Sequence, residues 1–190
     1  TIWEVLQAGL PRLPGILAVP AAGGMPEPSP HFQCNELMRL AAEQMGGTPH
    51  FIHAPYLPSD AARPTLLADP SVQEAVSLWD RVDVALVGIG LPYNVDRAQG
   101  GTAATPSDPA LTGAAGDVLQ RYVDAEGRLM PWAGDARLLM MTPEQLRRTP
   151  LVIGVAAGPV KAAGIVGAAR AGLISALVTD ARTAEAVLAL

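Results

Sequence analysis

Lys161, the single lysine in a chain with 12 arginines, is the residue best placed to bind an anion because of its position in the sequence. It belongs to Gly158-Pro159-Val160-Lys161, which directly follows the most apolar predicted strand. Gly158 would cap a helix there, Pro159 suits its first position, and Lys161 falls in its first turn. Backbone amides, the helix dipole and an ammonium would then converge, which is the chemistry of an anion site.

An ordinary surface lysine at a helix start is the alternative interpretation of Lys161. A cation near a helix N-terminus is unfavourable unless an anion compensates for it, so the position favours a binding role. The segment is not a nucleotide-binding P-loop, because the spacing G-x-x-x-x-G-K-[ST] is absent.

Gly23 and Gly24 follow the first predicted strand and precede a predicted helix. Glycines at such a turn let the backbone approach a ligand, and the helix N-terminus after them suits a phosphate. Gln33 and Asn35, in the first turn of that helix, could bond to sugar hydroxyls. An ordinary strand-to-helix turn explains the same residues, and taken alone it is the simpler interpretation.

A second glycine loop, Gly88-Ile89-Gly90, follows the apolar strand predicted at 83–87. It is not a dinucleotide-binding fingerprint, because Tyr93 stands where G-x-G-x-x-G needs its third glycine. Two interpretations stay open, a loop that approaches a phosphate or sugar and a tight turn.

Two aspartates complete the candidate polar groups. Asp117, after Gly116, could accept hydrogen bonds from sugar hydroxyls or could cap a turn. Asp180, after Thr179, is most simply the N-cap of the last helix.

Catalytic and metal-binding patterns are scarce. His50 and His53 are three residues apart on a predicted strand, so they point to opposite faces, and His31 is the third histidine. Cys34 lies on the apolar face of its predicted helix and is expected in the core. We therefore predict no catalytic residue, no metal ligand and no cofactor.

The elements that must position these residues alternate along the chain. Strands are predicted near 16–19, 50–53, 83–87, 138–141, 151–156 and 174–178, a hairpin at 118–130, and helices near 30–45, 60–68, 70–80, 159–171 and 180–190. This alternation predicts an α/β fold with a doubly wound, mostly parallel, Rossmann-like sheet and a hairpin excursion. Ligands bind such sheets beyond the carboxyl ends of the strands, where the loops described above lie.

Composition limits the function. The 190 residues are 49% hydrophobic and 16% charged, with a net charge of −5, so this chain alone is a poor candidate for nucleic-acid binding. No apolar run is long enough to span a membrane, and one cysteine fits the cytoplasm. We expect one domain over 1–190, and the low fraction of charged residues predicts self-association.

Taken in their order along the chain, the motifs in these loops resemble those of a known family. The motifs are Gly23-Gly24 with Gln33-x-Asn35, Ala54-Pro55, Gly88-Ile89-Gly90, Gly116-Asp117 leading to Tyr122-Val123-Asp124-x-x-Gly127, Ala156-Ala157-Gly158-Pro159-Val160-Lys161 and Leu177-Val178-Thr179-Asp180. The set resembles the effector-binding domain of SorC-type bacterial transcriptional regulators, which include the central glycolytic gene regulator and the deoxyribonucleoside regulator.

That resemblance implies a sensor of a phosphorylated sugar, with a fold similar to sugar-phosphate isomerases. It also implies a preceding helix-turn-helix module, absent from this chain, that binds operator DNA, and a homodimer or homotetramer. Ligand contacts are expected at Thr1, Gly23, Gly24, Gln33, Asn35, Gly88, Ile89, Gly90, Arg97, Asp117, Gly158 and Lys161. The family usually has glycine where Ala157 stands, which bears on the identity of the ligand. A sugar-phosphate isomerase and a purely structural assembly domain are the alternative functions.

Overall fold

The computed structural model describes residues 2–25, 33–92 and 108–190. The chain forms two compact units, each made of two segments. The first unit contains Thr1–Val82 and Ala136–Gln145, and the second contains Asp83–Asp135 and Leu146–Leu190.

The first unit is mainly helical. Its elements are α1 (Ile2–Ala8), β1 (Leu17–Ala18), α2 (Cys34–Met45), β2 (Thr48–Pro49), α3 (Ala62–Ala68), α4 (Pro70–Ser77) and the 3-10 helix η2 (Leu78–Arg81). β1 and β2 pair in parallel, so this unit contains a short β-α-β crossover. Gly46 ends α2 in the left-handed conformation, as the glycines after this helix predict.

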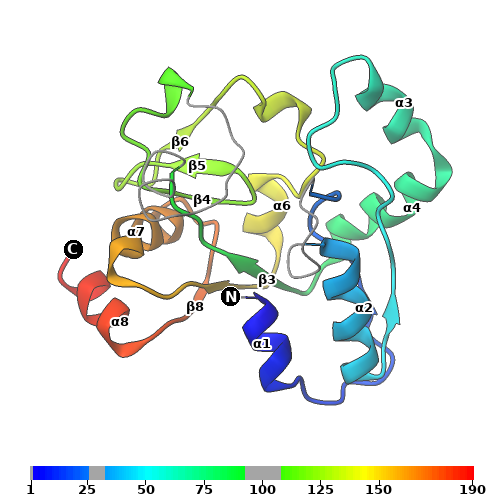
Figure 1. Ribbon diagram of the computed structural model, residues 1–190, viewed down its shortest axis with the longest axis horizontal. Helices are drawn as coiled ribbons and strands as arrows, with labels where there is room; N and C mark the ends of the chain where they lie inside the picture. The colour runs from blue at the N-terminus through cyan, green and yellow to red at the C-terminus, as the bar shows by residue number, and fades with distance from the viewer. Residues whose placement is uncertain (1, 26–32, 93–107) are drawn as a thin grey trace. The chain divides into compact units, whose positions relative to one another are not determined.

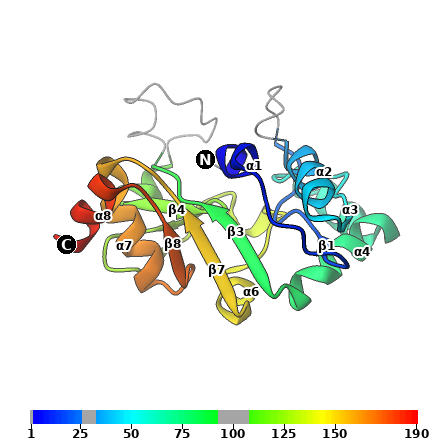
Figure 2. The same cartoon turned by 90° about the horizontal axis from the view of Figure 1, so that it is seen from below.

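The second unit holds a parallel sheet in the order β3-β7-β8, which Figure 2 shows side by side. Its strands are β3 (Val84–Gly88), β7 (Leu151–Val155) and β8 (Ala176–Val178). The η5 turn (Pro159–Lys161) and α7 (Ala162–Arg170) follow β7, and α8 (Ala181–Leu188) follows β8. β7 buries residues of both sheet faces, Val152 and Val155, whereas β3 buries Ala85 and Val87 on one face and leaves Val84 exposed. The cover on both faces that the apolar runs predict therefore holds for β7 and only in part for β3.

An antiparallel sheet completes the second unit, and Figure 1 shows its strands together. It contains β4 (Gly116–Val118), β5 (Arg121–Val123) and β6 (Leu129–Met130), while η3 (Pro109–Leu111) precedes it. The chain passes from one unit to the other within two elements, η4 (Asp135–Arg137) and α6 (Pro143–Arg148), so each of them has residues in both units.

The predicted α/β fold with parallel strands and a hairpin excursion is confirmed. Three local predictions were wrong. Residues 138–141 form a buried segment with one isolated bridge, from Met140 to Ala22, instead of a strand. The second strand ends at Pro49, before 50–53. The hairpin predicted at 118–130, with Val118–Val123 as its first strand, instead has an additional turn at 119–120 that separates β4 from β5.

Within the described ranges, no helix is long and apolar enough to cross a membrane.

Candidate functional site

Lys161 lies where the parallel sheet of the second unit ends. Its ammonium nitrogen Nζ donates a hydrogen bond of 2.8 Å to the carbonyl oxygen of Ile89, in the loop after the neighbouring strand β3. Lys161 as a whole is half-buried, and this hydrogen bond is partly buried. Lys161 therefore joins the loop after β7 to the Gly88-Ile89-Gly90 loop.

The turn that carries Lys161 begins as the sequence predicts. Gly158 caps η5, Pro159 takes its first position, and the Lys161 amide donates to the Gly158 carbonyl at 3.0 Å. Gly158 has φ 108° and ψ 124°, a conformation that side-chain-bearing residues rarely adopt. A 3-10 turn comes first, and α7 starts one residue after Lys161.

Asp117 lies against the same glycine loop. The Gly90 amide donates to the Asp117 carbonyl at 2.9 Å, and the Asp117 amide donates to the Gly90 carbonyl at 3.3 Å. The Asp117 carboxylate is so close to Gly90 that a Cβ atom at position 90 would collide with its Oδ1. Asp117 is 8% exposed, so it is a buried carboxylate at the strand ends.

A turn that the sequence does not reveal holds this carboxylate. Leu119 and Gln120 have φ of 52° and 57°, the left-handed pair of a tight hairpin turn that usually contains Asn or Gly. The Gln120 amide donates to Asp117 Oδ2 at 2.9 Å, and the Trp132 indole donates to the Gln120 carbonyl at 3.2 Å. These bonds compensate for a strained backbone that costs about 1–3 kcal/mol per residue.

Three of the loops singled out in the sequence therefore meet in the second unit. Lys161 contacts Ile89, and Asp117 contacts Gly90, so a cation and a carboxylate border two successive residues of one loop. Gly88 ends β3 opposite Val155. An ammonium can bind an anion, and a carboxylate can accept hydrogen bonds from hydroxyl groups. The two groups together suit a ligand that carries both an anion and several hydroxyls.

Gly158 takes part in a different way from that expected. Its amide donates to Thr183 Oγ1 at 2.8 Å and to Asp180 Oδ2 at 3.1 Å, so this N–H is used within the protein. Asp180 caps α8, as predicted, by accepting from the Thr183 amide. Thr183 is fully buried and was not singled out in the sequence.

The glycine pair of the first unit is bonded to its own backbone. The Gly23 amide donates to Leu139 at 2.9 Å, and the Gly24 amide donates to Ala54 at 2.8 Å. A Cβ atom on Gly23 would lie 2.6 Å from the Ala54 carbonyl, so close packing alone requires this glycine. Ligand contact at Gly23 and Gly24 stays a prediction.

Gln33 and Asn35 lie at the start of α2. The Asn35 side-chain amide bonds the Ile52 backbone in both directions, at 3.1 Å to its carbonyl and 3.0 Å from its amide. Gln33 donates to the Met25 carbonyl at 3.3 Å. Asn35 thus has a structural role in fastening the predicted 50–53 segment, and sugar contacts of both residues stay predictions.

Thr1 and Arg97 lie outside the described residues. Among the described residues, no three His, Cys, Asp or Glu side chains come together as a metal site. Burial raises the pKa of the Cys34 thiol, which makes this cysteine a poor nucleophile.

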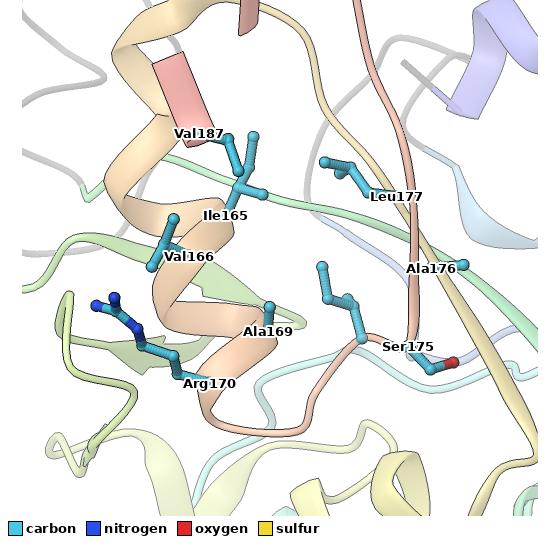
Figure 3. A pocket seen from close by; sticks show the side chains of 9 residues that line it. Ile165, Val166, Ala169, Arg170, Ser175, Ala176, Leu177 and Val187 are labelled. Carbon is cyan, nitrogen blue, oxygen red and sulfur yellow. The ribbon is translucent and has the colours of Figure 1, made fainter. Parts of the chain in front are cut away.

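A separate apolar hollow of about 280 Å³ lies in the second unit among α7, β8 and α8. In Figure 3, Ile165 and Val187 face Leu177 across it. The residues around the hollow are mainly aliphatic, and Arg170 and Ser175 are its polar members, so it offers few groups that could orient a sugar. We therefore assign the candidate site to the strand ends near Lys161.

Comparison with known proteins adds independent findings. A family model described as "Putative sugar-binding domain" matches residues 2–189. The chain is 31% identical over 181 residues to the sorbitol operon regulator of Klebsiella pneumoniae, covering 91% of this chain and 56% of that protein. It is 35% identical over 136 residues to the transcriptional regulator LsrR of Escherichia coli K12, covering 68% and 43%. The chain thus spans about half the length of these curated relatives.

Solved structures agree with the sequence matches. The full-length sorbitol operon regulator SorC of Klebsiella pneumoniae aligns with a TM-score of 0.85 and 28% identity, covering 98% of this chain and 63% of that one. A structure described as "Probable sor Operon Regulator" from Shigella flexneri aligns with a TM-score of 0.82 and 26% identity, covering 98% and 74%.

Proposed function

We propose, from the premise that this chain belongs to the sugar-binding domain family of SorC-type transcriptional regulators, that it senses a phosphorylated sugar. Binding of that effector would change how the full regulator binds its operator. The relatives are named as regulators, which supports sensing without turnover.

The observation that carries this proposal is the position of Lys161. A half-buried ammonium at the carboxyl end of a parallel sheet, bonded to the Ile89 carbonyl, is placed to contact an anion. The chain has no other lysine, and the η5 turn holds this one beside a helix start. In this proposal Lys161 binds the phosphate, and Asp117 accepts hydrogen bonds from sugar hydroxyls.

The remaining parts of the proposal concern the whole protein. A helix-turn-helix module preceding this chain would bind operator DNA, because the net charge of −5 gives this chain little attraction for DNA phosphates. The family match over 2–189 supports treating both compact units as one effector-binding domain.

The test compares matched sugars with and without phosphate, such as glucose 6-phosphate and glucose, in a thermal-shift screen. A ligand present at 100 times its Kd should stabilise the domain by about 2.7 kcal/mol. For any phosphorylated hit, Lys161→Ala should weaken binding by about 1.5–3 kcal/mol in calorimetry, the value of a charge-assisted hydrogen bond.

Val160→Ala is the matched control, because it shortens an exposed side chain of the same turn without changing its charge. It should bind normally. Equal affinity of Lys161→Ala and the unmodified chain for every phosphorylated hit would contradict the proposed phosphate contact, and turnover of the hit would favour an isomerase.

A further inference from the structure

Asp180, Thr183 and Gly158 form a closed set of hydrogen bonds beside the candidate site. The Thr183 hydroxyl donates to Asp180 Oδ2 and accepts the Gly158 amide at 2.8 Å. The Gly158 amide is also 3.1 Å from Asp180 Oδ2, and the Thr183 amide is 3.0 Å from Asp180 Oδ1. We call these three residues the clasp.

The clasp does more than cap α8. An N-cap aspartate needs only the amides of its own helix, and the bond from the Thr183 amide meets that need. The additional donor comes from Gly158, which precedes Asp180 by 22 residues. Thr183 is fully buried, so its hydroxyl is held in a fixed position with donor and acceptor both used.

The Gly158 peptide links the clasp to Lys161. Its N–H is held by Asp180 and Thr183, while its carbonyl accepts the Lys161 amide at 3.0 Å. Glycine can adopt many backbone conformations at little cost, and the contacts on both sides of Gly158 select this one, at φ 108°. Asp180 and Thr183, at the start of α8, therefore position the backbone of Lys161 through Gly158, and the Ile89 carbonyl positions its side chain.

We infer that Asp180 and Thr183 are positioning residues for the anion-binding lysine, which set the geometry of the η5 turn without touching the ligand. The inference rests on the proposed function, since it assigns the clasp to the same phosphate contact. The clasp keeps Lys161 in place before binding, and a ligand group bound by a preorganised ammonium loses less free energy to ordering of the protein.

The test measures affinity for the phosphorylated sugar found in the screen and for inorganic phosphate. Thr183→Val keeps the shape of the side chain and removes the hydroxyl that accepts the Gly158 amide. It should weaken both affinities by roughly threefold to tenfold, as expected for loss of one positioning hydrogen bond. Thr183→Ser restores the hydroxyl and should recover most of the affinity.

Ser175→Ala is the matched control. Its hydroxyl accepts the Val152 amide at 2.9 Å near the opposite end of the same strand pair, away from Lys161 along β7. Ser175→Ala removes the partner of the Val152 amide, so it should lower the melting temperature, by less than Thr183→Val because Ser175 is exposed, and leave phosphate affinity unchanged. Equal loss of affinity in both variants would show a general effect of stability and overturn the inference.

A double-mutant cycle separates this inference from the proposed function. In a Lys161→Ala background, Thr183→Val should cause no further loss of affinity, because the group that it positions is gone. Full additivity would overturn the positioning role. If Lys161→Ala leaves binding intact, the proposed phosphate contact fails, and the positioning role of Asp180 and Thr183 fails with it.

Discussion

Replacing Gly90 with alanine should destabilise the second unit because of the way Asp117 is held. The added Cβ would collide with Asp117 Oδ1. A carboxylate at the end of a free side chain could move aside at little cost. This one is 8% exposed, and its Oδ2 accepts the Gln120 amide at 2.9 Å, so moving it breaks a buried hydrogen bond.

The magnitude follows from two contributions. A hydrogen bond to a charged group is worth about 1.5–3 kcal/mol. Forcing an extra methyl group into a packed site costs about 1–3 kcal/mol. Because the two overlap, we expect a loss of about 3 kcal/mol in the free energy of unfolding. For a chain of this length that corresponds to a fall in melting temperature of roughly 6–12 °C.

Urea unfolding followed by circular dichroism measures this loss, and Gly88→Ala provides the control within the same loop. A Cβ at position 88 has no atom within 4 Å, and Gly88 lies at the end of a strand. Its replacement should therefore be neutral or stabilise by up to about 1 kcal/mol.

The reasoning would be refuted if both glycine variants unfolded at the same urea concentration. A second test uses Asp117→Ala as the background, because this substitution removes the obstructing carboxylate. In that background, Gly90→Ala should cost less than about 1 kcal/mol, because only the backbone bridge to residue 117 remains to be kept. If Gly90→Ala lowered the free energy of unfolding by the same amount in that background, the strain would not come from the Asp117 carboxylate.

Three further predictions concern other groups. Hydrogen bonds from Thr183 and Gly158 lower the pKa of Asp180 from 3.8 to about 2, so this carboxylate contributes stability above pH 4 that is lost as the pH falls through 2; Asp180→Asn should flatten that part of the unfolding free energy measured against pH. Asp135→Ala should cost about 2–4 kcal/mol in chemical unfolding, because Arg121 is 9% exposed and would lose its ion partner; a cost near that of a surface substitution would contradict this. Light scattering at micromolar concentration should show a dimer or tetramer, whereas a constant mass near 19.7 kDa would place self-association outside this chain.

Local patterns were enough to predict much of this protein. The apolar runs at 83–87 and 151–156 became β3 and β7, because strands of a parallel sheet are rich in apolar residues, although Val84 and Leu151 at their starts are exposed. Asp180 was identified as a cap, and Gly158-Pro159 as a helix start, because each signal acts within one turn of backbone. The ordered motifs also indicated the family, which the comparisons confirm.

Tertiary structure decided what those residues bond to. The bond from Lys161 to Ile89 joins residues 72 apart, and the clasp joins Gly158 to Thr183 across 25. Asn35, a candidate sugar contact in the sequence, also bonds the Ile52 backbone, which lies 17 residues further along the chain. The Leu119–Gln120 turn contains neither Asn nor Gly, so its left-handed backbone depends on the hydrogen bonds that Gln120 donates to Asp117 and accepts from Trp132. A sequence records which groups can donate or accept, but only the packed chain determines which distant groups meet, because that choice depends on the pairing of strands and the burial of their ends.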